Sequence, residues 1–356
     1  FGMAVSTAMI FGLVSLMFLD TSINMAMQPF KMMVGDMVNE KQKGLAYSIQ
    51  SFLCNAGSLV GFLFSFIFTW IGISNIAPQG VVPDSVIYSF YIGAAILILC
   101  VIYTTVKVKE MPPAEYAEYH GITEEEKKEK INMVKLLVKA PKAFWTVGLV
   151  QFFCWFAFMF MWTYTNGSVA ANVFDAPTVE TVVNGANKVV LDTKSIQYQN
   201  AADWVGVLFA VQAIGSVLWA VCIPMFKNRK LIYSLSLVLG GIGFISTYFV
   251  HNQYVLFISF LLIGCAWAAM LALPFTILTN ALSGGHMGTY LGLFNGTICI
   301  PQIVAATLGG SILALFTPKG MLPPEINMLV MAGVMLIIGA VCVYLIKETK
   351  GEQAKA

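Results

Sequence analysis

The sequence predicts an all-α membrane protein, and three observations lead to that fold class. Of its 356 residues, 58% are apolar and 11% are charged, whereas a soluble domain has roughly 45–50% apolar and about 25% charged residues. The mean hydropathy is +0.79. The apolar residues also fall in runs of about 20 or more, the length that crosses a hydrocarbon core of about 30 Å. We therefore expect a polytopic helical bundle.

Nine apolar runs are long enough to be membrane spans, and a charged stretch divides them unequally. The expected spans cover residues 3–36, 44–70, 86–106, 143–169, 204–226, 231–250, 254–279, 288–316 and 325–346. The stretch 107–142 contains eight Lys and seven Glu, so we expect a solvated, helical linker there. The predicted domains are a three-helix part at 1–106, the charged cytoplasmic linker at 107–142, a six-helix bundle at 143–346 and a cytoplasmic tail at 347–356.

The distribution of basic residues predicts the orientation in the membrane, because Lys and Arg are retained in cytoplasmic loops. Assigning the linker to the cytoplasm puts 16 of the 20 basic residues on that side. Lys188, Lys194 and Lys319 then lie outside, and Lys31 lies within the first span. We expect a multi-pass protein of the cell membrane with a cytoplasmic C-terminus.

Three spans before the linker and six after it indicate a six-plus-six architecture. This is the plan of the major facilitator superfamily, whose two halves enclose a central cavity near the middle of the membrane. We therefore expect nine spans present of a total of twelve, with three N-terminal helices absent. Phe1 opens directly into an apolar run, which also predicts that the natural N-terminus precedes this sequence.

A stripe of polar residues runs along one face of the first span. Asp20 and Lys31 are eleven residues apart, which brings Lys31 to within about 20° of Asp20 and about 16 Å further along a helix. Asn24 lies on that face and Gln28 flanks it. A charge inside the bilayer costs at least about 2.5–3.5 kcal/mol, so the stripe is expected to face a bundle interior or a water-filled path. The alternative is that the two charges hold helices together through partners elsewhere.

Two later spans carry further candidates for a binding site. The fourth span is rich in aromatic residues and contains Gln151, Trp155 and Trp162. Aromatic faces pack against the C–H surface of sugar rings, while amides form hydrogen bonds with their hydroxyls; the alternative is that these rings face lipid. Asn295 and Gln302 in the eighth span are seven residues apart on nearly one face, so we expect both amides to point inward.

Glycines repeat every four residues into the eighth span, at Gly284, Gly288, Gly292 and Gly296. Such a ridge of small residues lets helix backbones approach closely. The pattern fits a contact that moves during transport and equally a static one.

Other classes of function find little support in the sequence. The net charge of +2 leaves no basic excess for binding nucleic acid. The seven cysteines lie in apolar runs without a C-x-x-C pair, and no residue pattern suggests a metal site. The chain has neither a phosphate-binding loop nor a hydrolase motif. We expect no enzymatic activity and no cofactor, and energy for transport would have to come from an ion gradient or the substrate gradient.

Several segments resemble one branch of the major facilitator superfamily, the sucrose and disaccharide proton symporters. This branch is similar to the glycoside-pentoside-hexuronide transporters. The fourth helix of that branch has the features L-D-x-x-x-N, G-P-x-R and A-D. The segment 19–36 looks like this helix, with Leu19-Asp20 and Asn24, then Gln28-Pro29-Phe30-Lys31 and Gly35-Asp36. Four further matches are the G-x-x-x-G at Gly57 and Gly61, the pair Trp155-Phe156, the pair Pro274-Phe275, and Asn295 with Ile300-Pro301-Gln302. The resemblance spans nearly the whole chain.

The resemblance implies proton-coupled uptake of sucrose, maltose or a related glucoside by alternating access, with a sugar, a proton and the lipid bilayer as partners. Proton coupling is carried over to Asp20 and sugar binding to Lys31. Lys31 departs from the family, because it replaces a planar guanidinium by a point charge. The plant members have acids just after their W-F pair, whereas this chain reads Met161-Trp162-Thr163-Tyr164, so the identity of the sugar is not inherited from them.

The expected sugar site collects residues from three spans, and two alternatives to the leading function stay open. The site comprises Asn24, Gln28, Lys31, Gln151, Trp155, Trp162, Asn295 and Gln302. A non-transporting sensor or scaffold could keep the same bundle, and sodium could replace the proton as the coupling ion.

Overall fold

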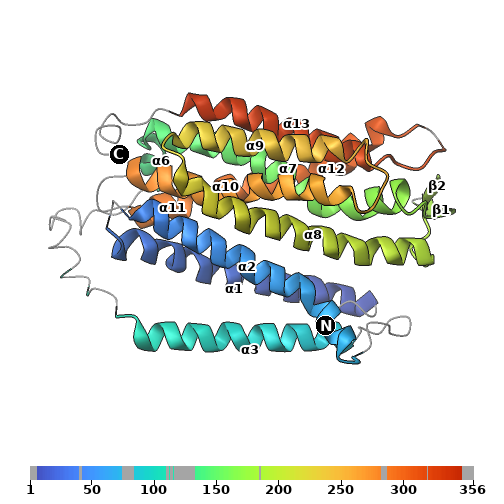
Figure 1. The fold of residues 1–356 in the computed structure, drawn as a ribbon, viewed down its shortest axis with the longest axis horizontal. Helices are drawn as coiled ribbons and strands as arrows, with labels where there is room; N and C mark the ends of the chain where they lie inside the picture. The colour runs from blue at the N-terminus through green and yellow to red at the C-terminus, as the bar shows by residue number, and fades with distance from the viewer. Residues whose placement is uncertain are drawn as a thin grey trace. The chain divides into compact units, whose positions relative to one another are not determined.

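The computed structural model describes residues 6–39, 42–73, 84–109, 112, 115, 133–183, 186–281, 287–318 and 320–346. Nearly all of these residues are helical, which confirms the expected all-α class (Figure 1). Eight helices within the described part are long and apolar enough to cross a membrane. Most of the charged linker and the whole C-terminal tail lie outside the described residues.

The described chain divides into two compact units, and the first contains the N-terminal helices. It consists of α1 (Ser6–Met37), α3 (Asp84–Lys107) and the later part of α2 (Lys43–Trp70). Within it, Phe68 of α2 lies 6.5 Å from Tyr88 of α3, measured between ring centroids. Apolar side chains cover the exposed surfaces of α1 and α3, as is typical of helices that face lipid.

The second unit is a helical bundle with α7 at its centre. Its helices are α6 (Met133–Val138), α7 (Lys142–Asn172), α8 (Ile196–Cys222), α9 (Arg229–Ser246), α10 (Leu256–Ala281), α11 (Met287–Phe294), α12 (Gly296–Phe316) and α13 (Ile326–Cys342), with short 3-10 turns η1 (Ile223–Met225) and η2 (Val343–Leu345). Helix α7 packs against α8, α10, α12 and α13, while α10 also packs against α8 and α9. The first part of α2 belongs to this unit too, and its Tyr47 stacks on Phe275 of α10.

The helices agree with the expected spans except at two places. Helix α8 begins at Ile196, well before the expected 204, because the Ser195 side chain accepts a hydrogen bond from the backbone N–H of Tyr198 and caps a polar first turn. The eighth span is two helices, α11 and α12, which meet at Asn295. Hydropathy reports neither feature, since both depend on polar residues at a helix end.

The long loop expected between the fourth and fifth spans contains a β-hairpin. Strands β1 (Thr178–Val183) and β2 (Ala186–Leu191) pair antiparallel, from Thr178 opposite Leu191 to Val183 opposite Ala186. Both strands are rich in Val, and β1 also in Thr, which are residues that favour extended backbone.

Helix backbones touch at two glycine contacts inside the second unit. A Cβ added to Gly215 of α8 would lie 2.5 Å from the carbonyl oxygen of Leu261, and one on Gly264 of α10 would meet the backbone of α8. In the second contact, a Cβ on Gly241 of α9 would lie 2.9 Å from the carbonyl oxygen of Gly333 on α13. These glycines therefore allow α8 to pack closely on α10, and α9 on α13.

The four-residue glycine repeat of the eighth span makes no such backbone contact at Gly292 or Gly296, the two members whose surroundings the structure describes. A Cβ on Gly292 would meet no atom within 4 Å, and one on Gly296 would meet only Ile300 of the same helix, at 3.8 Å. Gly57 and Gly61 of α2 are similarly open. Gly284 lies outside the described residues.

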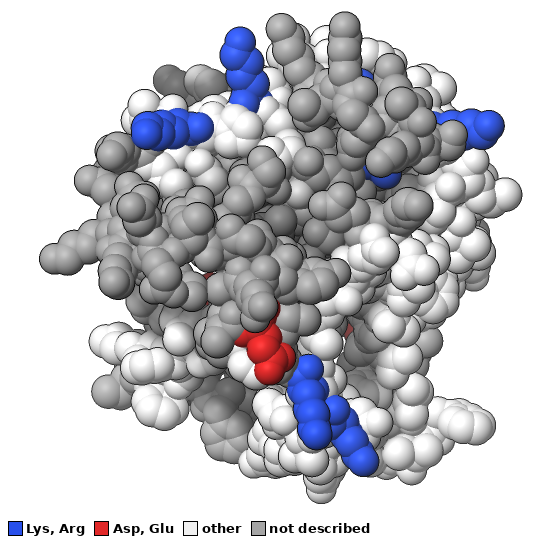
Figure 2. All heavy atoms as spheres, turned by 90° about the vertical axis from the view of Figure 1, so that its left-hand side faces the viewer, with Lys and Arg blue, Asp and Glu red and all other residues white. Residues whose placement is uncertain are grey.

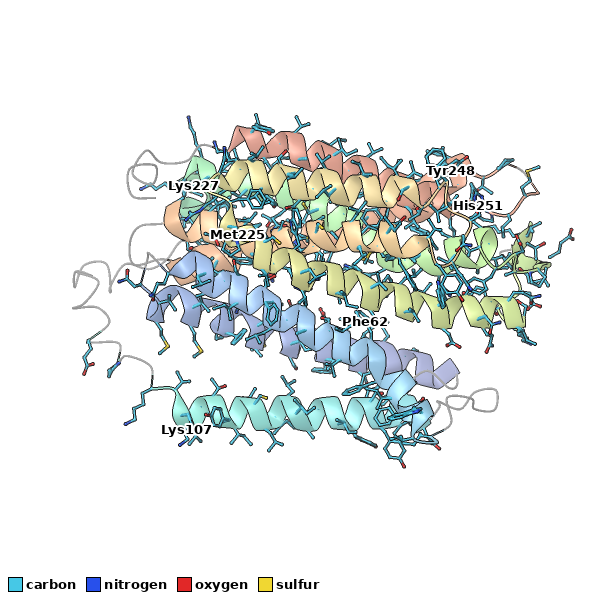
Figure 3. All side chains as sticks on the ribbon, in the orientation of Figure 1. Phe62, Lys107, Met225, Lys227, Tyr248 and His251 are labelled. Carbon is cyan, nitrogen blue, oxygen red and sulfur yellow. The ribbon has the colours of Figure 1, made fainter. Side chains whose placement is uncertain are left out.

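The two ends of the second unit differ in charge. The end at which α7 begins, here called the basic end, carries Lys139, Lys142, Lys227, Arg229 and Lys230. The opposite end, here called the acidic end, carries Asp175, Glu180, Asp192, Asp203 and Glu325 beside Lys188 and Lys194. Figure 3 labels Lys227 at the first end and His251 at the second. Figure 2 looks onto the left-hand side of Figure 1, where several blue Lys and Arg side chains and a red acidic one are visible.

Candidate functional site

Three tryptophans and a phenylalanine meet between α7 and α10. Ring centroids are 6.3 Å apart for Trp155 and Trp162, 5.7 Å for Trp155 and Trp267, and 5.7 Å for Trp162 and Trp267. Phe158 lies 4.9 Å from Trp267. Trp267 meets Trp155 and Trp162 nearly edge to face, a favourable arrangement for aromatic rings. We call these four residues the tryptophan cluster.

The tryptophan cluster is buried on one side and open on the other. Phe158 is fully buried, Trp155 and Trp267 are partly buried, and Trp162 is 42% exposed. On α7 the rings recur at three- and four-residue spacing, so they form one stripe along a single helix face. The cluster therefore offers ring surface to a molecule that approaches its open side.

Gln151 lies one turn before Trp155 on the same stripe and has one free hydrogen-bonding atom. Its side chain is fully buried, and its Nε2 donates to the carbonyl oxygen of Met270 on α10 at 2.9 Å. Its Oε1 has no partner in the structure, and neither does the buried Nε1 of Trp155. An acceptor and a donor, one helical turn apart, are thus both unpaired where buried polar groups are normally satisfied.

Asn295 also carries an unpaired buried atom, at the junction of α11 and α12. Its backbone N–H is shared between the carbonyl oxygens of Leu291 and Gly292, each at 3.2 Å. Its Nδ2 lies 3.8 Å from the sulfur of Cys299, while its Oδ1 is buried without a partner. Gln302 follows on α12 and is partly buried. Asn295 and Gln302 thus belong to α12 and its start, whereas Trp267 belongs to α10. Both of these helices pack against α7.

The polar stripe of the first span lies on α1, in the first unit. Helix α1 is continuous through the stripe, as the eleven-residue spacing argument requires. Asp20 is exposed, and Asn24 is partly buried and donates from Nδ2 to the carbonyl oxygen of Asp20 at 2.9 Å. The side chains of Gln28 and Lys31 lie outside the described residues. The stripe and the tryptophan cluster therefore belong to separate units.

Sequence reasoning missed Trp267, and only a weak signal marks it. It lies in Cys265-Ala266-Trp267-Ala268-Ala269, where a single large ring stands among small residues. Small neighbours let an adjacent helix approach, which is why Trp267 reaches both Trp155 and Trp162. The sequence also did not single out Asn166, whose Nδ2 donates to the Tyr198 hydroxyl at 2.9 Å while its buried Oδ1 has no partner.

Comparison with protein families gives one match, and it covers the chain from end to end. The sequence model of the Major Facilitator Superfamily matches residues 1–186 and 174–356. A comparison with curated proteins finds no match. The membrane-spanning helices agree with that family, whose members are transporters of small molecules. The chain therefore belongs to the Major Facilitator Superfamily and is a multi-pass membrane transporter of a small-molecule substrate.

Proposed function

We propose that this transporter is a symporter that couples the uptake of a disaccharide or glucoside to a proton. One observation carries the substrate class: the tryptophan cluster stands beside the unpaired Oε1 of Gln151 and the unpaired Nε1 of Trp155. It agrees with the resemblance of several segments to the sucrose and disaccharide symporters.

A sugar satisfies all parts of this arrangement at once. A hydroxyl group both donates and accepts hydrogen bonds, so hydroxyls that reach these two buried atoms when the helices move during transport can donate to Gln151 Oε1 and accept from Trp155 Nε1. The C–H face of the sugar ring packs on the exposed ring of Trp162. The tryptophan cluster and Gln151 carry no positive charge, which favours a neutral ligand over an anion.

The remaining proposed site residues extend this reading. Asn295, with its unpaired Oδ1, and Gln302 would bind further hydroxyls from α12. Asn24, Gln28 and Lys31 would contribute polar groups from α1. The central charge of α1 is Asp20, for which we propose the role of proton carrier, because a charge inside the bilayer is costly and acids within membrane spans mark proton and ion pathways.

The proposed orientation has a cytoplasmic C-terminus in the cell membrane. Among the described residues, the basic end of the second unit carries five Lys and Arg residues, whereas the acidic end has five acids and two lysines. Since positively charged residues are retained on the cytoplasmic side, this asymmetry supports a cytoplasmic basic end. The C-terminus follows α13, which ends at the basic end.

The direct test is transport in proteoliposomes that contain the full-length protein. Labelled sucrose and maltose should accumulate when the outside is made more acidic than the inside, and a protonophore should abolish that accumulation. A sodium gradient at constant pH should have no effect. Accumulation driven by sodium alone would contradict the coupling ion, and binding without any uptake would favour a sensor.

The Asp20→Asn variant tests the proton carrier. It should lose uphill accumulation driven by the pH gradient but keep downhill exchange of sugar, because the amide preserves shape and cannot release a proton. Asp203→Asn, at an exposed acid of α8, is the matched control and should behave like the wild type. Normal proton-driven accumulation by Asp20→Asn would refute the role of Asp20.

A further inference from the structure

Glu325 immediately precedes α13 at the acidic end, just before the membrane span Ile326–Leu345. Short polar side chains at this position accept hydrogen bonds from the first turn of their helix, and the positive end of the helix dipole attracts acidic side chains. The corresponding side chains of α8 and α9 do so: Ser195 accepts from Tyr198 and Asn228 from Leu231. The Glu325 side chain makes no such capping bond.

The Glu325 carboxyl instead reaches across to α7 and lies on Gly167. The space beside buried Gly167 that a Cβ would fill is taken by that carboxyl, whose Oε1 lies 2.7 Å from the Cβ position. One turn earlier on α7 is Tyr164, whose hydroxyl lies 2.6 Å from the Cβ position of Gly309 on α12. Two glycines, one on α7 and one on α12, thus make room for the two polar groups. We call the space beside Gly167 the glycine notch.

No cationic side chain in the described part of the chain compensates a negative charge in the glycine notch. Neither a cation nor a hydrogen-bond donor contacts the carboxyl of Glu325 there. On α7 the titratable group that interacts with it is Tyr164, on α12 the facing residue is Gly309, and the first turn of α13 has no titratable side chain. Further charged or titratable groups described at this end are His251, Asp175, Glu180, Lys188, Asp192, Lys194, Asp203, Tyr198, Tyr248 and Tyr254.

The surroundings therefore favour the neutral form of Glu325. Removal from water destabilises a carboxylate but not a carboxylic acid. Burial accordingly raises the pKa of Glu325 from its ordinary value of 4.5 to about 7. Around neutral pH, small changes in acidity then change its charge.

We propose that Glu325 is a second proton-binding site, and that its protonation fastens the start of α13 to α7. The neutral carboxyl stays in the glycine notch, whereas the carboxylate turns toward water and releases the first turn of α13. The site lies in the second unit and is distinct from Asp20 in the first. Its influence on transport rests on the proposed function, but proton binding at Glu325 does not.

Infrared spectroscopy of the full-length protein in lipid tests proton binding directly. The C=O stretch of a protonated carboxyl should disappear between pH 5.5 and 8.5 with a midpoint near 7, and Glu325→Gln should lack this band. Glutamine imitates the shape of the neutral acid, so this variant should fold. Persistence of the same titrating band in Glu325→Gln would overturn the assignment.

Filling the notch tests its geometry. Gly167→Ala should displace the carboxyl into water and move the midpoint of the band toward 4.5, while Gly310→Ala, where a Cβ meets no atom within 4 Å, should leave it near 7. An unchanged midpoint in Gly167→Ala would contradict the role of the notch.

Labelling tests the structural consequence independently of sugar transport. A cysteine at Asn327, in the first turn of α13, should react faster with a polar thiol reagent at pH 8.5 than at pH 5.5, relative to the parent protein and after correction for reagent ionisation. In the double variant that also carries Glu325→Gln, this pH dependence should vanish. Equal pH dependence with and without Glu325 would overturn the fastening of α13, even if sugar uptake proves to be absent.

Discussion

Three residues of the proposed sugar site, Gln151, Trp155 and Asn295, have an unpaired buried polar atom, as do a few residues outside it such as Asn166 and Ser216. The Nε1 of Trp219 donates to the Ser236 hydroxyl at 2.8 Å, and that of Trp204 donates to the carbonyl oxygen of Gln253 at 3.1 Å. The buried Nε1 of Trp155 has no partner. Because leaving a buried donor unpaired costs about 1–3 kcal/mol, such an atom is most simply explained by a ligand that pairs with it during the transport cycle.

This contrast predicts opposite results for two matched substitutions. Trp155→Phe should weaken sugar binding roughly fivefold or more, corresponding to a lost hydrogen bond of about 1 kcal/mol, and should lower the melting temperature only through the lost packing against Trp162 and Trp267. Trp219→Phe should leave sugar affinity unchanged and lower the melting temperature, because Ser236 loses a donor. Sugar-induced quenching of tryptophan fluorescence and thermal unfolding measure the two effects. If both variants lose only stability, Trp155 belongs to the packing of α7 and α10.

The raised pKa of Glu325 predicts a pH-dependent stability. A folded-state pKa of about 7, against 4.5 ordinarily, means that the folded protein binds this proton more tightly than the unfolded chain. The resulting stabilisation is complete below the unfolded value and is lost as the pH rises through 7. Glu325→Gln should therefore match the wild type at pH 5 more closely than at pH 8, where it should be more stable by on the order of 2 kcal/mol, after discounting for partial exposure.

Thermal unfolding at both pH values measures this difference. Glu180→Gln, at an exposed position of β1, is the control and should show no comparable pH dependence. A shift of equal size at pH 5 and pH 8 would mean that Glu325 acts through packing and not through its charge.

At the scale of helices, the position of a glycine matters more than its repetition. The regular repeat through Gly292 and Gly296 meets no neighbouring helix within the described residues, whereas Gly215 and Gly264 bring the backbones of α8 and α10 into contact. A ridge pattern in one helix shows that close approach is possible. Whether it occurs depends on which helix lies opposite, and that is set by the packing of the whole bundle.

Two glycine-to-alanine substitutions separate these situations. Gly264→Ala should destabilise the protein by about 1–3 kcal/mol, since the new methyl group would meet the backbone of α8. Gly206→Ala, where a Cβ meets no atom within 4 Å, should be neutral or stabilising by up to about 1 kcal/mol, because alanine favours the helix. Thermal unfolding in detergent checks both, and equal effects would contradict the α8–α10 contact.

At the scale of the whole molecule, the unequal charge of the two ends of the second unit predicts a labelling pattern. A cysteine at Lys227, an exposed position at the basic end, should react with an impermeant thiol reagent only from the cytoplasmic side. A cysteine at Thr193, exposed at the acidic end, should react only from outside. The parent protein, with its seven native cysteines, corrects for background. Reversed labelling would overturn the proposed orientation.

The sequence by itself determined the fold class, the approximate spans and part of the candidate site. Hydropathy is a local property, so runs of apolar residues identify helices such as α7 and α10 without any knowledge of their neighbours. The spacing of Gln151, Trp155 and Trp162 likewise places them on one face of α7, because helical periodicity is a property of a single helix.

Only the tertiary structure decided which residues from different helices meet. It joined Trp267 to Trp155 and Trp162, and it put the Glu325 carboxyl against Gly167, more than 150 residues earlier in the chain. Such contacts depend on the shapes of two facing surfaces and on the register between them. Hydropathy and periodicity describe one helix at a time, so they contain no information on facing surfaces or register. The contacts of Trp267 with the tryptophan cluster and of Glu325 with the glycine notch are therefore visible only in the packed bundle.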